Sequence, residues 1–163
     1  MPAFGAAPAW DPNSSRVVIA HVVSLARSLT EGFGIAVVAV TGQQSRRLRP
    51  APGCSYDSVA YSGSGLVLGE TCDIVSNNPR SALVQLSTDM RTEQSRRRLD
   101  TCSADPKVTA SGDQRQVLLV SSYVFCPGPH SAPKQRVEVL QGGHLRTVHD
   151  YVAPGEFLEG ATW

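Results

Sequence analysis

The chain has 163 residues, of which 41% are hydrophobic and 18% are charged, and its formal net charge is +1. This is the composition of a folded globular domain, and it excludes a disordered chain. The near-zero charge also excludes a global field that would draw the protein onto nucleic acid or a membrane surface. We therefore expect one domain with a continuous core.

The N-terminal region predicts a tail followed by a helix. Residues 1–12 are rich in Ala, Pro and Gly, which favours a flexible tail. Residues 13–31 predict a helix that Asn13, Ser14 or Ser15 can cap and that Gly32 can end. Apolar residues recur at helical spacing and form a broad stripe. The residues that define this stripe are Val18, Val22, Leu25 and Leu29.

The rest of the chain predicts strands and turns. Residues 33–41 form an apolar, β-branched run typical of a buried strand, and residues 43–53 predict a basic loop. Residues 91–102 predict a polar helix or loop. Further strands are expected within 55–70, 81–90 and 117–125, and in a closing hairpin around Gly142-Gly143.

We find no internal repeat, and one helix followed by strands favours an α+β fold over a βαβ fold. The predicted architecture is an N-terminal amphipathic helix packed on an antiparallel β-sheet. Residues 13–153 form the globular domain, and residues 154–163 form a loose C-terminal tail. The longest apolar run, residues 34–40, is too short to span a bilayer, and the start of the chain lacks signal-peptide features.

Four cysteines, at positions 54, 72, 102 and 126, favour two disulfides. None lies in a C-x-x-C pair, which argues against a zinc knuckle or a thioredoxin-type site. Four cysteines allow three connectivities. We favour Cys54–Cys72 and Cys102–Cys126, because neighbours in sequence are joined most easily. Disulfides would place the domain in the periplasm, at the cell surface or on an extracellular filament.

Two blocks of the chain resemble a known family. The helix predicted in the first block contains the step Ala26-Arg27-Ser28 and leads into an apolar strand. The second block runs from residue 108 to residue 148 as strand, Gly turn, strand ending in Cys, loop, strand, Gly, and a short strand with Arg. Its pattern positions are Gly112, Cys126, Arg136, Gly143 and Arg146. Together the blocks resemble the soluble domain of FimT/GspH-type minor pilins and pseudopilins.

The resemblance implies a structural role. The chain would be a non-catalytic subunit of a type IV pilus or type II secretion filament, with other pilin subunits as partners. The full-length form would be anchored in the membrane through an N-terminal helix that this sequence lacks. Some members of the family take part in DNA uptake, so DNA is a further expected partner.

No motif predicts catalysis, a cofactor or a metal. The segment "SGSGLVLG" lacks the spacing of a nucleophile elbow. His144 and His149 are five residues apart, which predicts opposite faces of a strand. Arginines on the closing hairpin and in the basic loop are candidates for sequence-independent phosphate contacts. These candidates are Arg136, Arg146, Arg46, Arg47 and Arg49.

Two other functions stay open at this point. One is an extracytoplasmic binding or sensor domain of a membrane protein. The other is a small secreted α+β enzyme, which would need a pocket that holds a histidine beside a carboxylate.

Overall fold

The computed structural model describes residues 9–11, 16–24, 31–39, 41, 43–63, 65–73, 79–99, 103–123 and 134–152. Within these residues the fold is all-β, with three antiparallel sheets of four strands each. The predicted α+β fold with an N-terminal helix is therefore wrong. None of the described residues belongs to a helix that could cross a membrane.

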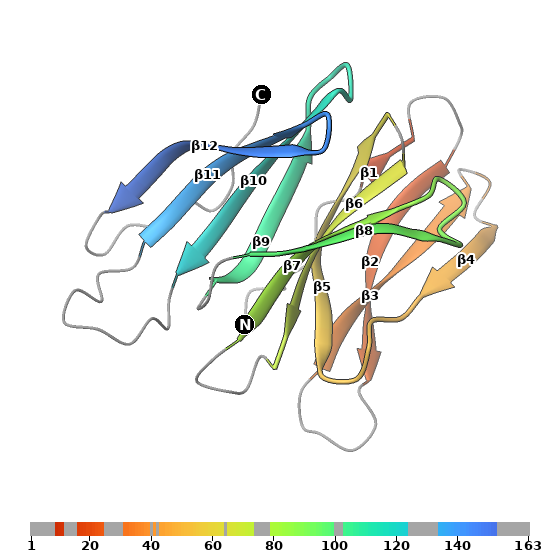
Figure 1. The fold of residues 1–163 in the computed structure, drawn as a ribbon. Helices are drawn as coiled ribbons and strands as arrows, with labels where there is room; N and C mark the ends of the chain where they lie inside the picture. The colour runs from red at the N-terminus through yellow and green to blue at the C-terminus, as the bar shows by residue number, and fades with distance from the viewer. Residues whose placement is uncertain are drawn as a thin grey trace.

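Each sheet is built from four consecutive strands (Figure 1). Sheet 1 contains β1 (Ala9–Trp10), β2 (Arg16–Ser24), β3 (Glu31–Ala39) and β4 (Gln44–Leu48). Sheet 2 contains β5 (Cys54–Ser62), β6 (Gly65–Cys72), β7 (Arg80–Leu86) and β8 (Glu93–Arg98). Sheet 3 contains β9 (Ser103–Ala110), β10 (Gln116–Tyr123), β11 (Lys134–Gln141) and β12 (His144–Val152). The strand order in each sheet follows the chain, so each sheet is an up-and-down meander.

The sheets pack face to face, with sheet 2 in the middle. One apolar cluster joins sheets 1 and 2, and a second cluster joins sheets 2 and 3. The first contains Val18, Ile35, Tyr56, Val59, Tyr61, Leu66, Leu68, Ala82, Val84, Leu86 and Met90. The second contains Ala60, Val67, Leu83, Val108, Val117, Leu119 and Leu140. Successive residues of β5 and β6 serve different clusters, because alternate side chains of a strand point to opposite faces.

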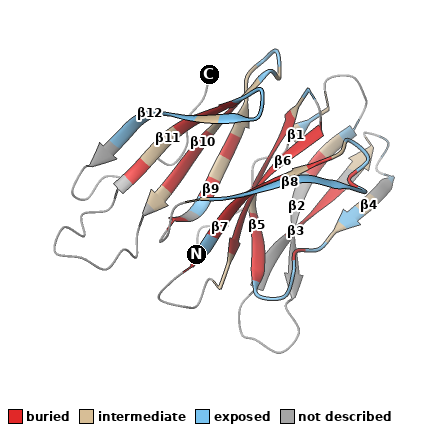
Figure 2. Cartoon of the chain, in the orientation of Figure 1, coloured by how far each residue is buried: buried red, intermediate tan, exposed pale blue. Residues whose placement is uncertain are grey.

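The first strands of the three sheets lie close to one another, and the last strands lie far apart. β5 contacts both β1 and β9, whereas every residue of β8 is exposed (Figure 2). Each neighbouring pair of sheets resembles a β-sandwich. The succession of four-stranded meanders with their first strands together is the arrangement of blades in a β-propeller.

Residues 16–24 of the segment predicted as a helix form strand β2 instead, whereas the strand predicted at 33–41 is confirmed as β3. β2 and β3 are antiparallel along their whole length, from Arg16 opposite Ala39 to Ser24 opposite Glu31. β-Branched residues dominate β2, with the sequence RVVIAHVVS, and they favour strands because they pack well on a pleated surface. In a strand with apolar residues on both faces, some apolar residues also recur at helical spacing. The sequence pattern alone therefore cannot distinguish such a strand from an amphipathic helix, and this ambiguity explains the wrong prediction. Leu25 and Leu29 lie outside the described residues.

Two polar segments are also strands. The predicted basic loop contains β4, and the predicted polar helix or loop contains β8. Both are the outermost strands of their sheets, where polar and charged side chains face solvent and protect the edge. The strands predicted within 55–70, 81–90 and 117–125 and the closing hairpin are confirmed.

A structural repeat is present, contrary to the prediction. The turns after β7 and β9 have the sequences Ser-Thr-Asp-Met-Arg-Thr at 87–92 and Ser-Gly-Asp-Gln-Arg-Gln at 111–116. In both turns the Ser hydroxyl donates to the Asp carboxylate, and the Asp carboxylate accepts from the following Arg N–H. The fourth residues, Met90 and Gln114, both have positive φ. The shared pattern S-x-D-x-R therefore encodes one turn geometry twice.

A glycine sets the distance between sheets 2 and 3. A Cβ atom at Gly69 on β6 would lie 2.1 Å from the carbonyl oxygen of Pro106 on β9. At the same contact the Ser58 hydroxyl donates to the Pro106 carbonyl at 2.6 Å and accepts from the Val108 N–H at 3.0 Å. Only glycine lets the two backbones approach this closely.

Candidate functional site

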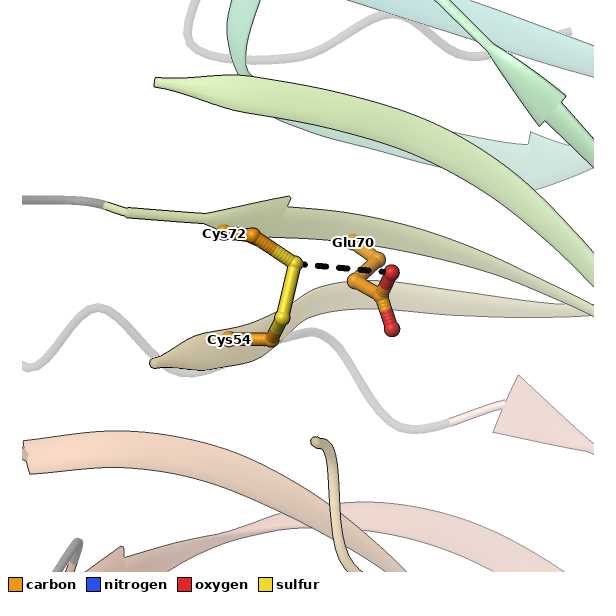
Figure 3. Close-up of side chains that lie close together, drawn as sticks. All are labelled: Cys54, Glu70 and Cys72. Carbon is orange, nitrogen blue, oxygen red and sulfur yellow. Dashed lines mark hydrogen bonds between the residues drawn. A yellow bond between two sulfur atoms is a disulfide. The ribbon is translucent and has the colours of Figure 1, made fainter. Parts of the chain in front are cut away.

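A disulfide closes the first hairpin of sheet 2. Cys54 on β5 lies directly opposite Cys72 on β6, and the two sulfurs are bonded (Figure 3). The Asp73 N–H donates to the Gly53 carbonyl at 2.8 Å, which makes Cys54 and Cys72 a non-hydrogen-bonded pair. Side chains are closest in such pairs, so the register itself positions the two sulfurs. The predicted pair Cys54–Cys72 is confirmed, whereas Cys102 and Cys126 lie outside the described residues.

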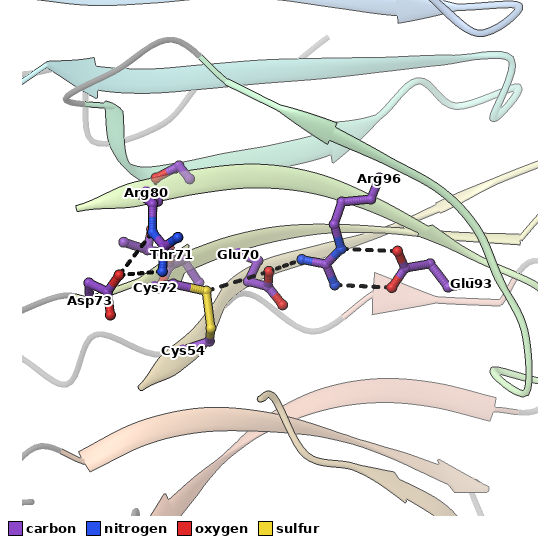
Figure 4. The surroundings of a disulfide bond; sticks show 10 residues. Cys54, Glu70, Thr71, Cys72, Asp73, Arg80, Glu93 and Arg96 are labelled. Atoms are coloured by element: carbon purple, nitrogen blue, oxygen red, sulfur yellow. Dashed lines mark hydrogen bonds and ion pairs between the residues drawn. A yellow bond between two sulfur atoms is a disulfide. The ribbon is translucent and has the colours of Figure 1, made fainter. Parts of the chain in front are cut away.

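A buried carboxylate lies beside the disulfide. Glu70 is 1% exposed, and its Oε1 atom is 3.7 Å from the Cys72 sulfur (Figure 3). Because a disulfide sulfur carries no proton, this approach becomes a hydrogen bond only after reduction. Arg96 on β8 donates to Glu70 and, at 3.0 Å, to Glu93 (Figure 4). The hydrogen bond that Arg96 donates to Glu93, together with its hydrogen bond to Glu70 and the negative charge of Glu70, raises the pKa of Arg96.

These groups line the face of sheet 2 that meets sheet 1. Tyr56 lies opposite Glu70 across β5 and β6, and burial and then the Glu70 charge raise the pKa of Tyr56 to about 12. The side-chain ligand atoms of Cys54, Glu70 and Cys72 all lie within 4.8 Å of one another. With the sulfurs bonded to each other no thiolate is available, so this trio is a disulfide with a neighbouring ion pair and not a metal centre.

The other face of sheet 2 carries a network of hydroxyl and carboxyl groups. The Thr71 hydroxyl donates to the Asp57 carboxylate at 2.5 Å, lies 3.1 Å from the Ser81 hydroxyl and accepts from the Asp105 N–H at 3.2 Å. The Ser81 hydroxyl in turn donates to the Ser103 carbonyl of β9 at 2.6 Å. These bonds tie sheet 2 to the first strand of sheet 3.

Asp57 is the most perturbed carboxyl group of this network. Desolvation raises the pKa of Asp57 to about 7, the nearby Asp105 charge adds to the rise, and the Thr71 hydrogen bond opposes it. A carboxyl group that titrates near neutral pH could serve as a general acid or base. In this structure the Asp57 carboxylate instead accepts a hydrogen bond from the Thr71 hydroxyl of the neighbouring strand. Asp57 thereby belongs to the hydrogen-bond network between sheets 2 and 3, which is a structural role.

Three adjoining hollows lie at the end of the stack where the hairpin turns of sheets 2 and 3 gather. The inner hollow, of about 350 Å³, is lined by first strands of all three sheets and includes Trp10 and Ala110. The middle hollow, of about 340 Å³, includes Gln85, Arg115 and Gly143, and the outer hollow, of about 270 Å³, includes Arg97. We call the three together the turn-end groove.

Shared lining residues connect the hollows into one track. Gln114 lines both the inner and the middle hollow, and Gln85, Leu140 and Gly143 line both the middle and the outer hollow. Gln114 has φ +57°, and its carbonyl accepts the Gly63 N–H at 2.9 Å, which fixes the two turns to each other. The inner end of the groove is apolar. The side-chain amides of Gln85 and Gln114 lie along its length, and Arg115 and Arg97 lie toward its outer end.

Of the arginines that line the groove, Arg96 is paired with Glu70 and Glu93, whereas Arg97 and Arg115 make few contacts with acidic groups. Arg97 donates to the Gly143 carbonyl at 3.0 Å, and among the described residues no carboxylate forms an ion pair with it. Arg115 approaches Asp113 at 4.0 Å, and both side chains are largely exposed. A surface pair of this kind contributes little, so both guanidinium groups can bind a further anion.

The arginines predicted to contact DNA are not gathered in one place. Arg46 and Arg47 lie on β4 of sheet 1 with Arg49 just beyond, while Arg136 and Arg146 lie on sheet 3, at the other end of the stack. Arg46 donates to the Asp89 carbonyl at 2.9 Å, and Arg136 pairs with Asp150 at 2.7 Å.

The two hairpin arginines also point to different faces of sheet 3. Arg136 is three residues from Val139, which lies opposite Arg146, so strand alternation separates their side chains. Conversely, His144 and His149 share a face, because a bulge between Val137 and Glu138 places one extra residue in β12. Four register steps still separate these histidines, which is on the order of 13 Å along the strand and too far for one metal ion.

The residues that line the groove were missed at the sequence level. Gln85, Gln114, Arg97 and Arg115 come from two sheets, and only the packing of those sheets brings them together. One local signal existed, since Gln114 and Arg115 belong to the S-x-D-x-R turn that occurs twice in the chain.

One solved structure gives an independent view of the fold. Kuenenia stuttgartiensis hydrazine synthase matches with a TM-score of 0.58 at 13% sequence identity, over 84% of this chain and 40% of that chain. Identity this low shows a likeness of fold alone, and this chain spans less than half of the hydrazine synthase chain. No family model matches the sequence, and no curated protein matches it significantly.

The resemblance to FimT/GspH-type pilins is wrong. Ala26-Arg27-Ser28 lie outside the described residues, but Arg16–Ser24 before them is a strand where the resemblance implied a helix, and a structural neighbour of the chain is hydrazine synthase. The carboxy-terminal pattern of strands, glycines and arginine arises because a meander with Gly-containing turns has the same outline in many all-β proteins.

Proposed function

We propose that this chain is a non-catalytic, extracytoplasmic binding module that holds an extended acidic segment of a partner protein in the turn-end groove. The observation that carries the proposal is the groove itself, which runs from an apolar end at Trp10 to Arg115 and Arg97. The Cys54–Cys72 disulfide supports the location, because disulfides persist mainly in oxidising compartments.

The chemistry of the lining favours a polypeptide. The side-chain amides of Gln85 and Gln114 can each donate to and accept from a peptide backbone. The inner hollow can take an apolar side chain, and the guanidinium forks of Arg97 and Arg115 fit carboxylates in a bidentate manner.

Duplex DNA fits these observations less well. A duplex carries one charge per about 1.7 Å of its axis and binds best to a row of cations. Three arginines line the groove, but Arg96 is paired with Glu70 and Glu93, and Asp113 lies beside Arg115. The arginines of β4, β11 and β12 lie on separate parts of the stack. DNA is therefore the competing outcome of the test and not the proposed ligand.

The test is a fluorescence anisotropy titration of the oxidised chain with a labelled Glu-rich peptide that carries one aromatic residue. We expect saturable binding that weakens with salt and at least a tenfold loss when Glu is replaced by Gln in the peptide. Arg97→Ala and Arg115→Ala should each weaken binding several-fold. Arg80→Ala is the matched control, because Arg80 is exposed and pairs with Asp73 at the opposite end of sheet 2.

Two outcomes of this titration would argue against an acidic peptide as the ligand. Equal binding of the Glu and Gln peptides, or equal effects of Arg80→Ala and Arg97→Ala, would contradict the proposal. Tighter binding of a duplex oligonucleotide than of the peptide would replace the acidic segment by nucleic acid as the ligand class.

A further inference from the structure

The Cys54–Cys72 disulfide and the Glu70 carboxylate bring together side chains of the types that bind Zn²⁺. Two sulfurs and one carboxylate oxygen lie within 4.8 Å of one another (Figure 3). In the oxidised chain the sulfurs are bonded to each other, so neither can bind a metal ion. Reduction by a dithiol changes this state. The dithiol supplies two electrons and two protons and becomes a disulfide, while the S–S bond of the chain breaks and leaves two thiols.

Strand pairing holds these three groups on one face of sheet 2. Cys54 lies opposite Cys72, and the next pair on this face is Tyr56 opposite Glu70. Glu70 and Cys72 are two residues apart on β6, so their side chains point to the same side of the sheet. β6 is hydrogen-bonded to β5 on one side and to β7 on the other, so its register does not depend on the S–S bond. The reduced chain therefore keeps two thiols and one carboxylate as neighbours.

The spacing of the three groups suits a tetrahedral Zn²⁺ ion. Bonds of about 2.3 Å to sulfur and about 2.0 Å to oxygen, at tetrahedral angles, place two sulfurs about 3.8 Å apart and a sulfur and an oxygen about 3.5 Å apart. Glu70 Oε1 already lies 3.7 Å from the Cys72 sulfur. Residues directly opposite each other in an antiparallel pair have Cβ atoms about 5 Å apart, so side-chain rotation alone can bring two thiols to the required spacing.

The charges around the three groups also balance when a divalent ion is bound. Two thiolates and the Glu70 carboxylate carry three negative charges, and Zn²⁺ together with Arg96 carries three positive charges. Arg96 donates to Glu70 (Figure 4), and a carboxylate has further lone pairs that can bind a metal. Carboxylates that bind a metal are commonly held by such an outer hydrogen bond. Because Glu70 is buried, this balance avoids an uncompensated charge in the interior.

The three groups lie where a reductant and a metal ion can reach them. Residues 51–53, directly before Cys54, are exposed, and Cys72 is half-buried. Within the described part of the chain no further His, Cys, Asp or Glu side chain joins this group, so a water molecule completes the tetrahedron.

We propose that the reduced chain binds one Zn²⁺ ion through the thiolates of Cys54 and Cys72 and the carboxylate of Glu70, with water as the fourth ligand. Binding breaks two S–H bonds and releases both protons to solvent. It forms two Zn–S bonds and one Zn–O bond to the protein. The disulfide and the zinc ion are therefore alternative occupants of one position in sheet 2, and the redox state of the cysteines selects between them.

The test is a titration of the reduced chain with Co²⁺, an optical probe for tetrahedral zinc sites, followed by displacement with Zn²⁺. The full chain is reduced with a dithiol, which is then removed without oxygen. The titration is repeated with the Cys102→Ser, Cys126→Ser variant, whose only cysteines are Cys54 and Cys72. In this variant we expect one Co²⁺ per chain with a thiolate charge-transfer band, and a Kd for Zn²⁺ below about 1 µM. A reduced chain without this band, or an oxidised chain that shows it equally, would overturn the proposal.

Two single variants separate the proposed site from unspecific binding. Glu70→Gln removes the carboxylate and should weaken Zn²⁺ binding at least about tenfold. Asp73→Asn is the matched control, because it removes the same charge beside Cys72 from a side chain that pairs with Arg80 at 2.5 Å (Figure 4). This control should change the affinity less than about twofold. Equal affinities of the two variants would contradict a role of Glu70 as a ligand.

Alkylation of the reduced wild type gives a second measurement that needs no substitution. Peptide mapping by mass spectrometry follows the reaction of each cysteine with iodoacetamide. Zn²⁺ should slow the alkylation of Cys54 and Cys72 at least about tenfold, because a metal-bound thiolate is withheld from the reagent. Unchanged rates at these two positions in the presence of Zn²⁺ would overturn the proposal, whatever the stability of the Glu70 variant.

Discussion

The two faces of the central sheet differ in how their polar groups are satisfied. Toward sheet 1, Glu70 is buried and depends on Arg96, beside the Cys54–Cys72 disulfide (Figure 4). Toward sheet 3, the Thr71 hydroxyl accepts from the Asp105 N–H and the Ser81 hydroxyl donates to the Ser103 carbonyl, and both of these neutral hydrogen bonds cross to the neighbouring sheet. The first face concentrates covalent and ionic stabilisation within sheet 2. The second joins two sheets through weaker bonds and leaves a groove at its turn end.

The largest effect is expected from the buried ion pair. Arg96→Ala leaves the Glu70 carboxylate buried without its charged partner, which should lower the free energy of unfolding by about 3 to 4 kcal/mol. Urea denaturation followed by circular dichroism measures this loss. Glu93→Gln, on the exposed side of the same arginine, should cost less than about 1 kcal/mol. Equal losses for the two variants would mean that Glu70 is solvated.

The disulfide should contribute nearly as much. Its sequence separation is 18 residues, and in the chain-entropy model a loop of this size corresponds to about 3 kcal/mol. The Cys54→Ser, Cys72→Ser double variant should therefore unfold at lower urea concentration than the wild type. A thiol reductant should destabilise the wild type more than this variant. If the oxidised wild type and the double variant had the same urea midpoint, the disulfide would not stabilise the fold.

The close approach of sheets 2 and 3 predicts an intermediate effect. In Gly69→Ala the new methyl group meets the Pro106 carbonyl, and the backbones must separate at a cost of about 2 kcal/mol. Gly112→Ala is the matched control, because a Cβ atom there meets nothing within 4 Å. If thermal unfolding shows the same midpoint for both variants, the close approach at Gly69 does not limit the packing of sheets 2 and 3.

The smallest effect is expected from pH. The folded-state pKa of Asp57 is raised to about 7, so between about pH 4 and pH 7 the folded state binds more protons than the unfolded state. The contribution of Asp57 to stability is therefore present at low pH and is lost as pH rises through 7. Because the side chain is half-buried, we expect a change of about 1 kcal/mol.

The control for the pH prediction is a second aspartate. Asp57→Asn should remove this part of the pH dependence. Asp113→Asn should retain it, because hydrogen bonds from Ser111 lower the pKa of Asp113 below its usual range. A pH profile that Asp57→Asn leaves unchanged would show that Asp57 titrates normally.

Local patterns predicted the local pairings of this fold. Turn residues separate short β-branched runs in these parts of the sequence, so their strands could be predicted. These strands are β5, β6, β7 and β10 and the pair β11–β12. The disulfide Cys54–Cys72 was readable for a related reason, since it closes a single hairpin. These features depend on residues that are close in sequence.

The sequence-based predictions that were wrong concern features that depend on packing between residues far apart in the sequence. The run from Val17 to Val23 fits a helix and a strand with two apolar faces, and the choice depends on the neighbouring β3. β4 and β8 are polar because they are outermost strands, which no local pattern reveals. The groove joins Gln85 and Arg97 with Gln114 and Arg115 from another sheet, so the sequence could not place them together.

Sheet 2 meets sheet 1 in a stabilising interface, and we propose that it binds a ligand at the turn end of its interface with sheet 3. Hydrogen exchange followed by mass spectrometry, with and without the Glu-rich peptide, tests both parts at once. We predict slow exchange in β5 and β6 without ligand, and added protection on binding in residues 83–97, 111–117 and 140–143. Added protection confined to β2 and β3, or fast exchange throughout β5 and β6, would contradict the account.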